Sequence, residues 1–416
     1  MKKGLWGCFV VFLVFALLTI GVPNPGPVKA AEEIKVGVIF PLTGPVASIG
    51  VASQRGVTMA VDRINSEGGI KSMGGAKIKL FFGDDEAKPN VAMTEGERLI
   101  KQEKVDALIG SYTSSCSFPL TQVAEVNKIP ILVGSSAKDE ITERKFKYTF
   151  RAELKASWIA RDQVNFIKFL ASKTGVPVKT IGLLYEDSGW GQSFAKDVVP
   201  LIKQAGFQLV SEIPYPKDTK DMRSFILKLK AANPDLVLQE SYTEDAILVT
   251  KTMHELQFYS KGILGTGTGH SSPFYHDGVG GLDEYLMKWE SWSPAIPLEE
   301  VRVRSKEFLE RFKTPMDPFS AKCYTVGFIL AQGYEIAGSK DKDKLRDALR
   351  KVNVKVGDKG YTHLFPMKYD ADGQAPEAVG VHTQVVKGQY VVLAPEIGAT
   401  GKPVYPAPPW SERLKK

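Results

Sequence analysis

A regular alternation of short apolar segments with longer helical segments is the feature that most constrains the fold of this chain. Four segments have the length and composition of buried strands, at 34–40, 76–83, 105–109 and 129–133. Helical spacing of apolar residues separates them, at 50–65 and 89–103. This alternation predicts a parallel, doubly wound α/β sheet with helices on both faces. Ligands of such sheets bind outside the carboxyl ends of the strands.

A second series of the same kind begins after Arg151. Its expected helices lie at 157–172, 192–204, 222–232 and 244–256, and its expected strands at 180–185, 207–213, 235–239 and 262–265. The regularity then lapses and resumes with helices at 299–312, 318–337 and 342–351 and a β-hairpin at 379–386 and 389–393. Two such series predict two α/β lobes, inferred from the pattern because no sharp internal repeat is visible.

The first 30 residues have the pattern of a secretory signal peptide. Lys2 and Lys3 precede an apolar run at 9–20, and Val28-Lys29-Ala30 resembles a cleavage site. We therefore expect a signal peptide at 1–30 and a periplasmic protein. Removal of these residues from 416 leaves 386, which exceeds one common domain and favours two lobes.

Charge and cysteine content narrow the partners and the chemistry. Removal of the signal peptide takes away three lysines and no acidic residue, so the formal charge falls from +7 to +4. The basic residues are spread along the chain, so we expect no nucleic-acid partner. Cys116 and Cys323 remain, and the sequence leaves open whether they pair or stay separate buried thiols.

The turn Gly110-Ser111-Tyr112-Thr113-Ser114-Ser115 joins an expected strand to an expected helix. Unpaired N–H groups and the positive end of the helix dipole coincide at a helix N-terminus, so Ser114 and Ser115 are candidates for binding a small carboxylate. The alternative is an ordinary Ser/Thr helix cap. Ser135 and Ser136 occupy the same kind of position after the following strand.

Two aromatic residues, Trp190 and Tyr242, lie on strand-to-helix turns of the second series. Aromatic rings at the carboxyl ends of strands in one lobe would close over a small ligand held by hydroxyls of the other lobe. The alternative is that both rings fill their own lobe.

Catalytic and metal sites are not expected. Ser135-Ser136-Ala137-Lys138 matches the S-x-x-K pattern of penicillin-recognising enzymes, but the S-D-N element is missing. The five histidines show no metal-ligand spacing, and no nucleophile has a visible base. We predict a protein that is not an enzyme and needs no cofactor or metal.

Several motifs in order resemble the periplasmic leucine/isoleucine/valine-binding protein family, the solute receptors of ABC importers. They are Ile34-Lys35-Val36-Gly37-Val38, Pro41-Leu42-Thr43-Gly44-Pro45, Ile64-Asn65-Ser66-Glu67-Gly68-Gly69-Ile70, Ile129-Pro130-Ile131 and Tyr185-Glu186-Asp187 with Trp190-Gly191-Gln192. The resemblance implies two α/β lobes joined by three crossings that close like a hinge. It implies one lobe at 31–151 plus 294–362, and the other at 152–293 plus 363–416.

The resemblance also implies a binding site between the lobes. Ser114 matches the serine that holds the ligand carboxylate, and the other matching positions are Ser135, Ser136, Ala137, Trp190 and Tyr242. Gly267 stands where amino-acid-binding relatives carry a Glu that pairs with the ligand ammonium, and Ile49 where an aromatic often lines the pocket. Either an acid such as Glu240, Glu244 or Asp245 substitutes, or the ligand is an aromatic or aliphatic carboxylate without an ammonium group.

We therefore expect a monomeric periplasmic protein that binds a small carboxylate or amino acid and delivers it to an ABC permease in the inner membrane. The alternative is a ligand-sensing module that acts on a signalling partner. The sequence does not decide between an amino acid and another carboxylate as ligand.

Overall fold

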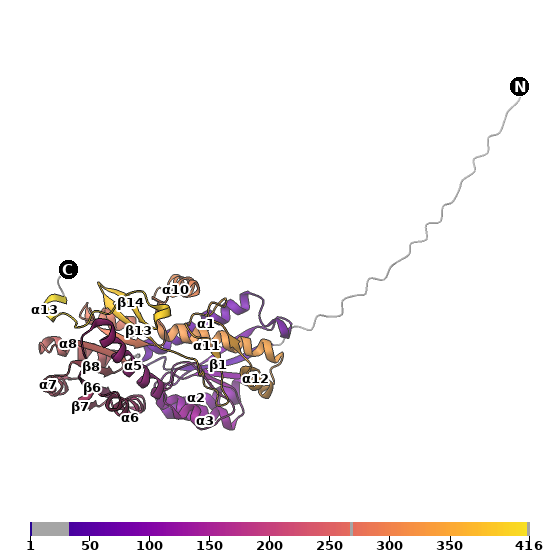
Figure 1. Cartoon of the computed structure of the whole chain (residues 1–416). Helices are drawn as coiled ribbons and strands as arrows, with labels where there is room; N and C mark the ends of the chain where they lie inside the picture. Colours follow the sequence, from indigo (N-terminus) through magenta and orange to yellow (C-terminus); the bar gives the residue numbers. More distant parts are fainter. Residues whose placement is uncertain (2–32, 267–268, 414–416) are drawn as a thin grey trace.

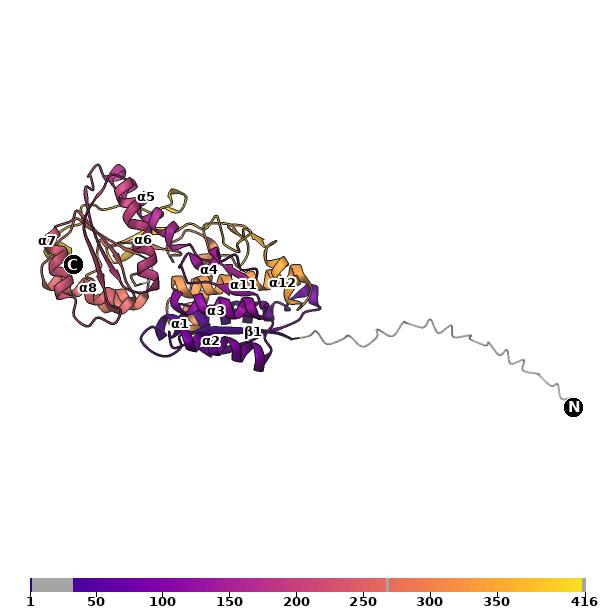
Figure 2. The same ribbon diagram turned by 90° about the horizontal axis from the view of Figure 1, so that it is seen from below.

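Two β-sheets with helices packed against them organise the chain. The structure is a computed structural model that describes Met1, residues 33–266 and residues 269–413. The predicted signal peptide at 1–30, apart from Met1, therefore lies outside the described residues. Figures 1 and 2 show the sheets in two separate halves of the molecule. Within the described residues, no helix combines the length and the apolar character needed to cross a membrane.

The first sheet has five parallel strands in the order β2-β1-β3-β4-β5. The strands are β1 (Ile34–Phe40), β2 (Ile78–Asp84), β3 (Ala107–Gly110), β4 (Ile131–Val133) and β5 (Thr149–Arg151). The elements between them are α1 (Ala47–Ser66), η1 (Lys71–Met73), α2 (Pro89–Arg98), η2 (Leu99–Glu103), α3 (Ser114–Val126) and α4 (Glu140–Glu143). Val36 of β1 pairs with Leu80 and Ala107, so β1 lies inside the sheet and is buried among apolar neighbours.

The second sheet repeats the same order, β7-β6-β8-β9-β10, and adds β13 and β14 antiparallel at one edge. Its strands are β6 (Thr180–Glu186), β7 (Gln208–Tyr215), β8 (Leu236–Glu240), β9 (Gly262–Thr266), β10 (Met287–Glu290), β13 (Val381–Val386) and β14 (Gln389–Ala394). Its helices are α5 (Ala156–Thr174), α6 (Gly189–Gln204), α7 (Arg223–Ala232), α8 (Thr243–Glu255) and α9 (Pro273–Val279). The two sheets are thus two copies of one topology without a visible sequence repeat.

The chain returns to the first half after β10 with α10 (Glu299–Phe312), α11 (Pro318–Ala337) and α12 (Lys342–Leu349). It passes between the halves three times: after β5, after β10 and before β13. The remaining elements are β11 (Asn353–Val354), β12 (Met367–Lys368), η3 (Glu396–Gly398) and α13 (Trp410–Arg413). We call the β1 sheet with its helices and α10 to α12 the first half, and the β6 sheet with its helices the second half.

Helix α11 is fixed by its start and by its contact with α1. Asp317 caps it, because its carboxylate accepts the Ser320 N–H at 2.7 Å, and Pro318 occupies the first position, where a missing N–H costs nothing. Gly56 of α1 lies so near this helix that a Cβ at position 56 would be 2.1 Å from the carbonyl oxygen of Ser320. The backbones of α1 and α11 therefore touch directly.

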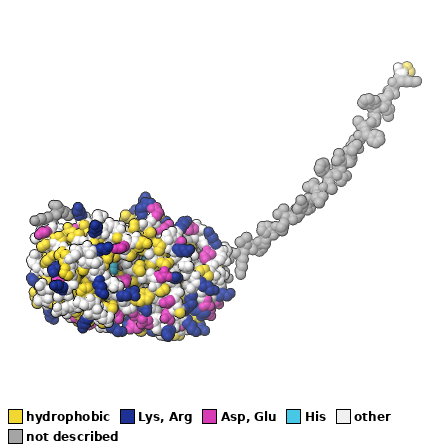
Figure 3. Space-filling view, viewed as in Figure 1, with side chains coloured by type: hydrophobic (Ala, Val, Ile, Leu, Met, Phe, Trp, Pro, Cys, Tyr) yellow, Lys and Arg dark blue, Asp and Glu magenta, His cyan; other side chains and the backbone are white. Residues whose placement is uncertain are grey.

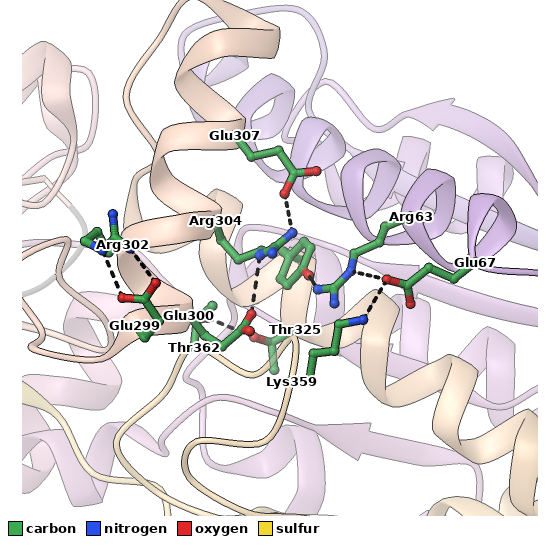
Figure 4. A network of polar contacts seen from close by, with 11 residues as sticks. Arg63, Glu67, Glu299, Glu300, Arg302, Arg304, Glu307, Thr325, Lys359 and Thr362 are labelled. Carbon is green, nitrogen blue, oxygen red and sulfur yellow. Dashed lines mark hydrogen bonds and ion pairs between the residues drawn. The ribbon is translucent and has the colours of Figure 1, made fainter.

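Charged side chains reinforce this packing at the surface. Figure 3 shows basic and acidic side chains interspersed over one face of the molecule. In the network of Figure 4, Arg63 of α1 donates to Glu67 at 3.2 Å and to the Tyr324 hydroxyl of α11 at 2.6 Å. Lys359, between β11 and β12, reaches the same Glu67 carboxylate at 3.3 Å. These pairs tie α1, α11 and the returning chain together.

A buried arginine holds two of the three passages to each other. Arg151, at the end of β5, is fully buried and donates to the Gln374 side-chain oxygen at 2.7 Å and to the Lys138 carbonyl at 2.6 Å. Gln374 in turn donates to the Glu153 carbonyl at 2.7 Å. Burial lowers the pKa of Arg151 to about 10, so it keeps its charge at neutral pH. The first and third passages are therefore joined through one cation.

The predicted fold class is confirmed: two doubly wound α/β halves are joined by three passages of the chain. The helices predicted at 299–312 and 318–337 are α10 and α11 with unchanged bounds. Strands β5 and β10 and helix α9 were not predicted, because β5 and β10 are short and β10 and α9 lie in the Gly-, Ser- and Pro-rich region. Cys116 and Cys323 are free, buried thiols. The exact lobe boundaries stay a prediction.

The close α1–α11 contact gives a test of the packing. Gly56→Ala should destabilise the protein by about 1–3 kcal/mol, because the new methyl group forces two backbones apart. Gly189→Ala is the matched control, since this glycine also lies in a helix and an added Cβ meets no heavy atom of the described structure within 4 Å. Thermal unfolding of both variants measures the difference. Equal melting temperatures would contradict the direct contact.

Candidate functional site

A cavity lies where the carboxyl ends of strands from both sheets meet. In each sheet the strands lie in the order 2-1-3-4-5. The connections that follow strands one and three pass to opposite faces of the sheet, so a crevice opens between the carboxyl ends of these two strands. The cavity is lined by residues that follow these and neighbouring strands and by the start of α11: Tyr112, Ser114, Ser135, Ala137, Glu153, Ile159, Trp190, Tyr242, Ser271, Trp289, Ser291, Pro318, Phe319 and Lys322.

The first half contributes Ser114, the first residue of α3. Its hydroxyl accepts the Lys138 N–H at 3.2 Å, across to the turn after β4. The N-cap of α3 is Thr113, whose side chain makes no capping hydrogen bond within the described residues. The N-cap position is therefore held by a threonine of this turn, and Ser114 stands one residue further along. Because the first N–H groups of a helix lack acceptors within the helix, this corner is a candidate site for a hydrogen-bond acceptor.

The second half contributes Trp190 and Tyr242, both largely buried. Trp190 is the second residue of α6. Its backbone N–H donates to the hydroxyl of Ser188, the N-cap, at 3.4 Å. Gly191 follows because a Cβ there would lie 1.9 Å from the Glu186 carbonyl oxygen. The turn thus admits no side chain at position 191 and fixes the neighbouring indole at the cavity wall.

Three aromatic rings connect the halves beside the cavity. Tyr112 of the first half meets Tyr242 of the second half edge to face, with ring centroids 6.1 Å apart, and Phe319 of α11 packs on Tyr112 at 5.4 Å. Such pairs contribute about 0.5–1.5 kcal/mol each beyond burial of their area. The free volume of the cavity is about 30 Å³, room for roughly two waters. The space between the halves is therefore narrow at this site.

Comparison with known families identifies this architecture. A model of the periplasmic binding protein family matches residues 33–389. The chain belongs to this family. The Leu/Ile/Val-binding protein homolog 7 of Brucella abortus (strain 2308) is 31% identical over 399 residues, which cover 92% of this chain and 96% of the relative. The chain therefore resembles binding proteins along nearly its whole length.

Solved structures share the fold of this binding protein. The branched-chain amino acid transporter substrate-binding protein LivJ from Streptococcus pneumoniae, in complex with isoleucine, has a TM-score of 0.77 at 19% identity and covers 88% of this chain and 100% of its own. A solute-binding protein of an ABC transporter from R. palustris, in complex with benzoate, has a TM-score of 0.76 at 21% identity, with 90% and 98% covered.

The binding protein brings together five of the nine predicted site residues. Ser114, Ser135, Ala137, Trp190 and Tyr242 line the cavity between the halves. Ser136 is buried behind it, where its hydroxyl donates to the Tyr112 carbonyl at 2.9 Å, and Ser115 is exposed. Ile49 lines a second cavity, and Gly267 lies outside the described residues.

The second cavity has a volume of about 590 Å³ and lies on the other side of the tyrosine pair. Tyr112 and Tyr242 line both cavities, and Ile49 from α1 faces Lys217 and Asp245 from the second half across the second one. The tyrosines therefore form a partition between a narrow inner cavity and a wide outer one.

The three acids considered as ammonium partners differ in their surroundings. Glu244 and Asp245 both line the outer cavity, where Glu244 is exposed, and Glu240 is fully buried, with an oxygen so close to Gly191 that a Cβ there would be 2.6 Å away. Burial and the negative charge of Glu186 raise the pKa of Glu240 well above its usual range. Burial raises the pKa of Asp245 to about 7.

Sequence analysis missed several lining residues of this binding protein. Trp289 and Ser291 lie in or after β10, a strand that was not predicted. Glu153 lies on the first passage between the halves, where no periodic pattern marks it. One signal was available for Lys322: it is the only charged residue between Pro318 and Gly333, in the most apolar of the predicted helices.

Asp245 gives a pH test of the site. Its pKa is raised from 3.8 to about 7 in the folded protein, so the folded state binds more protons than the unfolded state between these values and loses stability as the pH rises through them. Asp245→Asn removes this loss, and the Asn side-chain oxygen still accepts the Tyr215 hydroxyl that now donates to Asp245. The variant should melt several degrees higher than the parent at pH 8 and not at pH 4.

Glu244→Gln is the matched control for this measurement, because Glu244 is the exposed neighbour. It should leave the pH dependence of melting unchanged. A parent-like pH profile for Asp245→Asn would show that Asp245 titrates normally.

Proposed function

We propose that this chain is the periplasmic solute-binding protein of an ABC importer, which binds a small carboxylate or amino-acid-like ligand between its halves and delivers it to the permease. The observation that carries this proposal is the cavity itself. Hydroxyls at the start of α3 and after β4 face an indole and a phenol from the other half across one small space.

The binding chemistry follows from these groups. The ligand carboxylate accepts the Ser114 hydroxyl and N–H groups of the first turn of α3, where the helix dipole favours negative charge. Trp190 and Tyr242 cover the apolar part of the ligand and exclude water, which strengthens the hydrogen bonds. Because the groups come from both halves, only a closed molecule makes all the contacts.

Ligand entry requires the halves to separate. An amino acid does not fit a free volume of about 30 Å³, so the ligand must bind an open state, and closure then completes its contacts. The three passages of the chain are the places where this motion occurs. The permease recognises the closed form, in which both halves present one continuous surface.

The ligand class follows from particular side chains that line the two cavities. Ala137 supplies no hydroxyl, and Ile49 supplies an aliphatic side chain at the outer cavity. The ligands of two similar proteins support an aliphatic or aromatic carboxylate, because LivJ is described with isoleucine and the R. palustris protein with benzoate. We propose an aliphatic or aromatic carboxylate, because Asp245, the candidate partner for a ligand ammonium group, lines the outer cavity and not the inner one.

The remaining parts of the proposal concern export, the bounds of the two lobes and Gly267. We propose that residues 1–30 are the signal peptide, that the mature protein is a periplasmic monomer, and that its lobes are 31–151 plus 294–362 and 152–293 plus 363–416. Gly267 stays in the proposed site as the position that lacks the ammonium partner.

A ligand screen with two site variants tests the proposal. Thermal-shift screening of amino acids and of aromatic and aliphatic carboxylates should find a stabilising ligand. Ser114→Ala should weaken its binding by about ten- to a hundredfold, the value of a hydrogen bond to a charged group, and Trp190→Ala should weaken it further. Isothermal titration calorimetry measures both effects.

Ser115→Ala is the comparison variant, because this exposed hydroxyl lies outside both cavities. It should bind like the parent. Unchanged affinity in the Ser114 and Trp190 variants would place the binding site elsewhere.

A further inference from the structure

A buried ion pair faces the cavity between the halves. Lys322 of α11 and Glu153, two residues after β5, are 4% and 3% exposed. The Lys322 ammonium donates to a Glu153 carboxylate oxygen. Among the described residues that line the cavity, these are the two with charged side chains. A buried charged pair at the wall of a small cavity has to be explained by what the cavity binds.

The hydrogen-bonding capacity of this pair is not used up. An ammonium has three N–H donors, and within the described part of the chain the bond to Glu153 is the only hydrogen bond that the Lys322 ammonium makes. Its remaining contact is with the Phe319 ring, whose centroid is 5.0 Å away. A buried ammonium is stable only when its donors are bonded, so two donors are available to a group in the cavity.

Glu153 is more nearly satisfied. One carboxylate oxygen accepts the Leu154 N–H at 2.8 Å and the other accepts Lys322. Each oxygen of an ionised carboxylate has two lone-pair sites, so each keeps one free. The pair thus offers two donors from the lysine and an acceptor from the glutamate, side by side.

Neighbouring charged groups do not compete for the lysine. Asp317 is the N-cap of α11, and one of its carboxylate oxygens accepts the Ser320 N–H and hydroxyl at 2.7 and 2.6 Å. Burial and the charge of Lys322 lower the pKa of His363 to about 3, so His363 is neutral. The positive charge of Lys322 is therefore already offset by the bonded Glu153 carboxylate, and the buried Asp317 carboxylate adds a second negative group that Lys322 also attracts.

This balance selects the kind of ligand group. A second ligand carboxylate beside Lys322 would face Glu153 with like charge and no further cation in the cavity wall. A hydroxyl avoids this repulsion, because it accepts from the lysine and donates to the glutamate. An ether or ketone oxygen would use only the lysine.

We propose that Lys322 and Glu153 together bind a hydroxyl group of the ligand, so that the transported solute is a hydroxylated carboxylate. This inference rests on the proposed function, since it adds a second anchor to the carboxylate site at Ser114. The two anchors contact different parts of the chain: Ser114 adjoins the turn at Lys138, and Lys322 adjoins the first passage between the halves.

Paired ligands test the inference. Isothermal titration calorimetry compares benzoate with the three hydroxybenzoate isomers, the methoxybenzoates and terephthalate, and pentanoate with its hydroxylated forms. At least one hydroxylated acid should bind about ten- to a hundredfold more tightly than its parent acid, the range for a hydrogen bond to a charged group. The methoxy and dicarboxylate analogues should not show this gain.

Variants assign the gain to the pair. Lys322→Met alone leaves Glu153 buried without its cation and can unfold the protein. The test variant is therefore Lys322→Met combined with Glu153→Gln, which keeps the volume and removes both charges. It should lose the preference for the hydroxyl, so that the hydroxylated acid and its parent acid bind it equally well. Lys322→Arg should retain part of the preference.

The outcomes separate this inference from the proposed function. Binding of benzoate or pentanoate without any preference for a hydroxyl, or a preference that survives in the double variant, overturns the inference alone. Equal weakening of all acids in the double variant also overturns it, because Lys322 would then serve the first carboxylate. Failure of every carboxylate and amino acid to bind contradicts the proposed function itself.

Discussion

The site depends on one constraint, that all strands of a parallel sheet end at the same edge. The same order, 2-1-3-4-5, is built twice, so each half presents the turns after its first and third strands beside a crevice. Three passages of the chain bring those two edges together. Trp190 after β6 and Tyr242 after β8 therefore share a cavity with Ser114 after β3, although more than 70 residues separate Ser114 from the nearer of the two.

The contacts that join the two halves differ in strength. Arg151 ties the first passage to the third through Gln374, and the Tyr112–Tyr242 contact holds the halves closed by weaker aromatic packing. A hinge needs this difference, because the anchor must survive opening while the closing contacts must break at small cost. We propose that ligand contacts to both walls shift the balance toward the closed form. Lys322 and Glu153 connect α11 to the first passage, and both also line the cavity.

Much of the fold could be predicted because its signal is periodic. Strand-to-helix alternation located nearly every long element, and α10 and α11 began and ended at the predicted residues. Ser114, Trp190 and Tyr242 could be named because each stands at a strand end. Lys322, Glu153 and Trp289 could not be named, since they reach the cavity through a covering helix, a passage and a short strand. Their placement depends on contacts between segments far apart in the sequence, which no local pattern encodes.

The central claim is that one small carboxylate is bound between the halves. A crystal structure of the protein with the tightest-binding carboxylate from the screen tests it most directly. We expect a ligand carboxylate oxygen within hydrogen-bonding distance of the Ser114 hydroxyl and the rest of the ligand against Trp190. A ligand bound to one half alone, or outside the cavity that these two residues line, would contradict it.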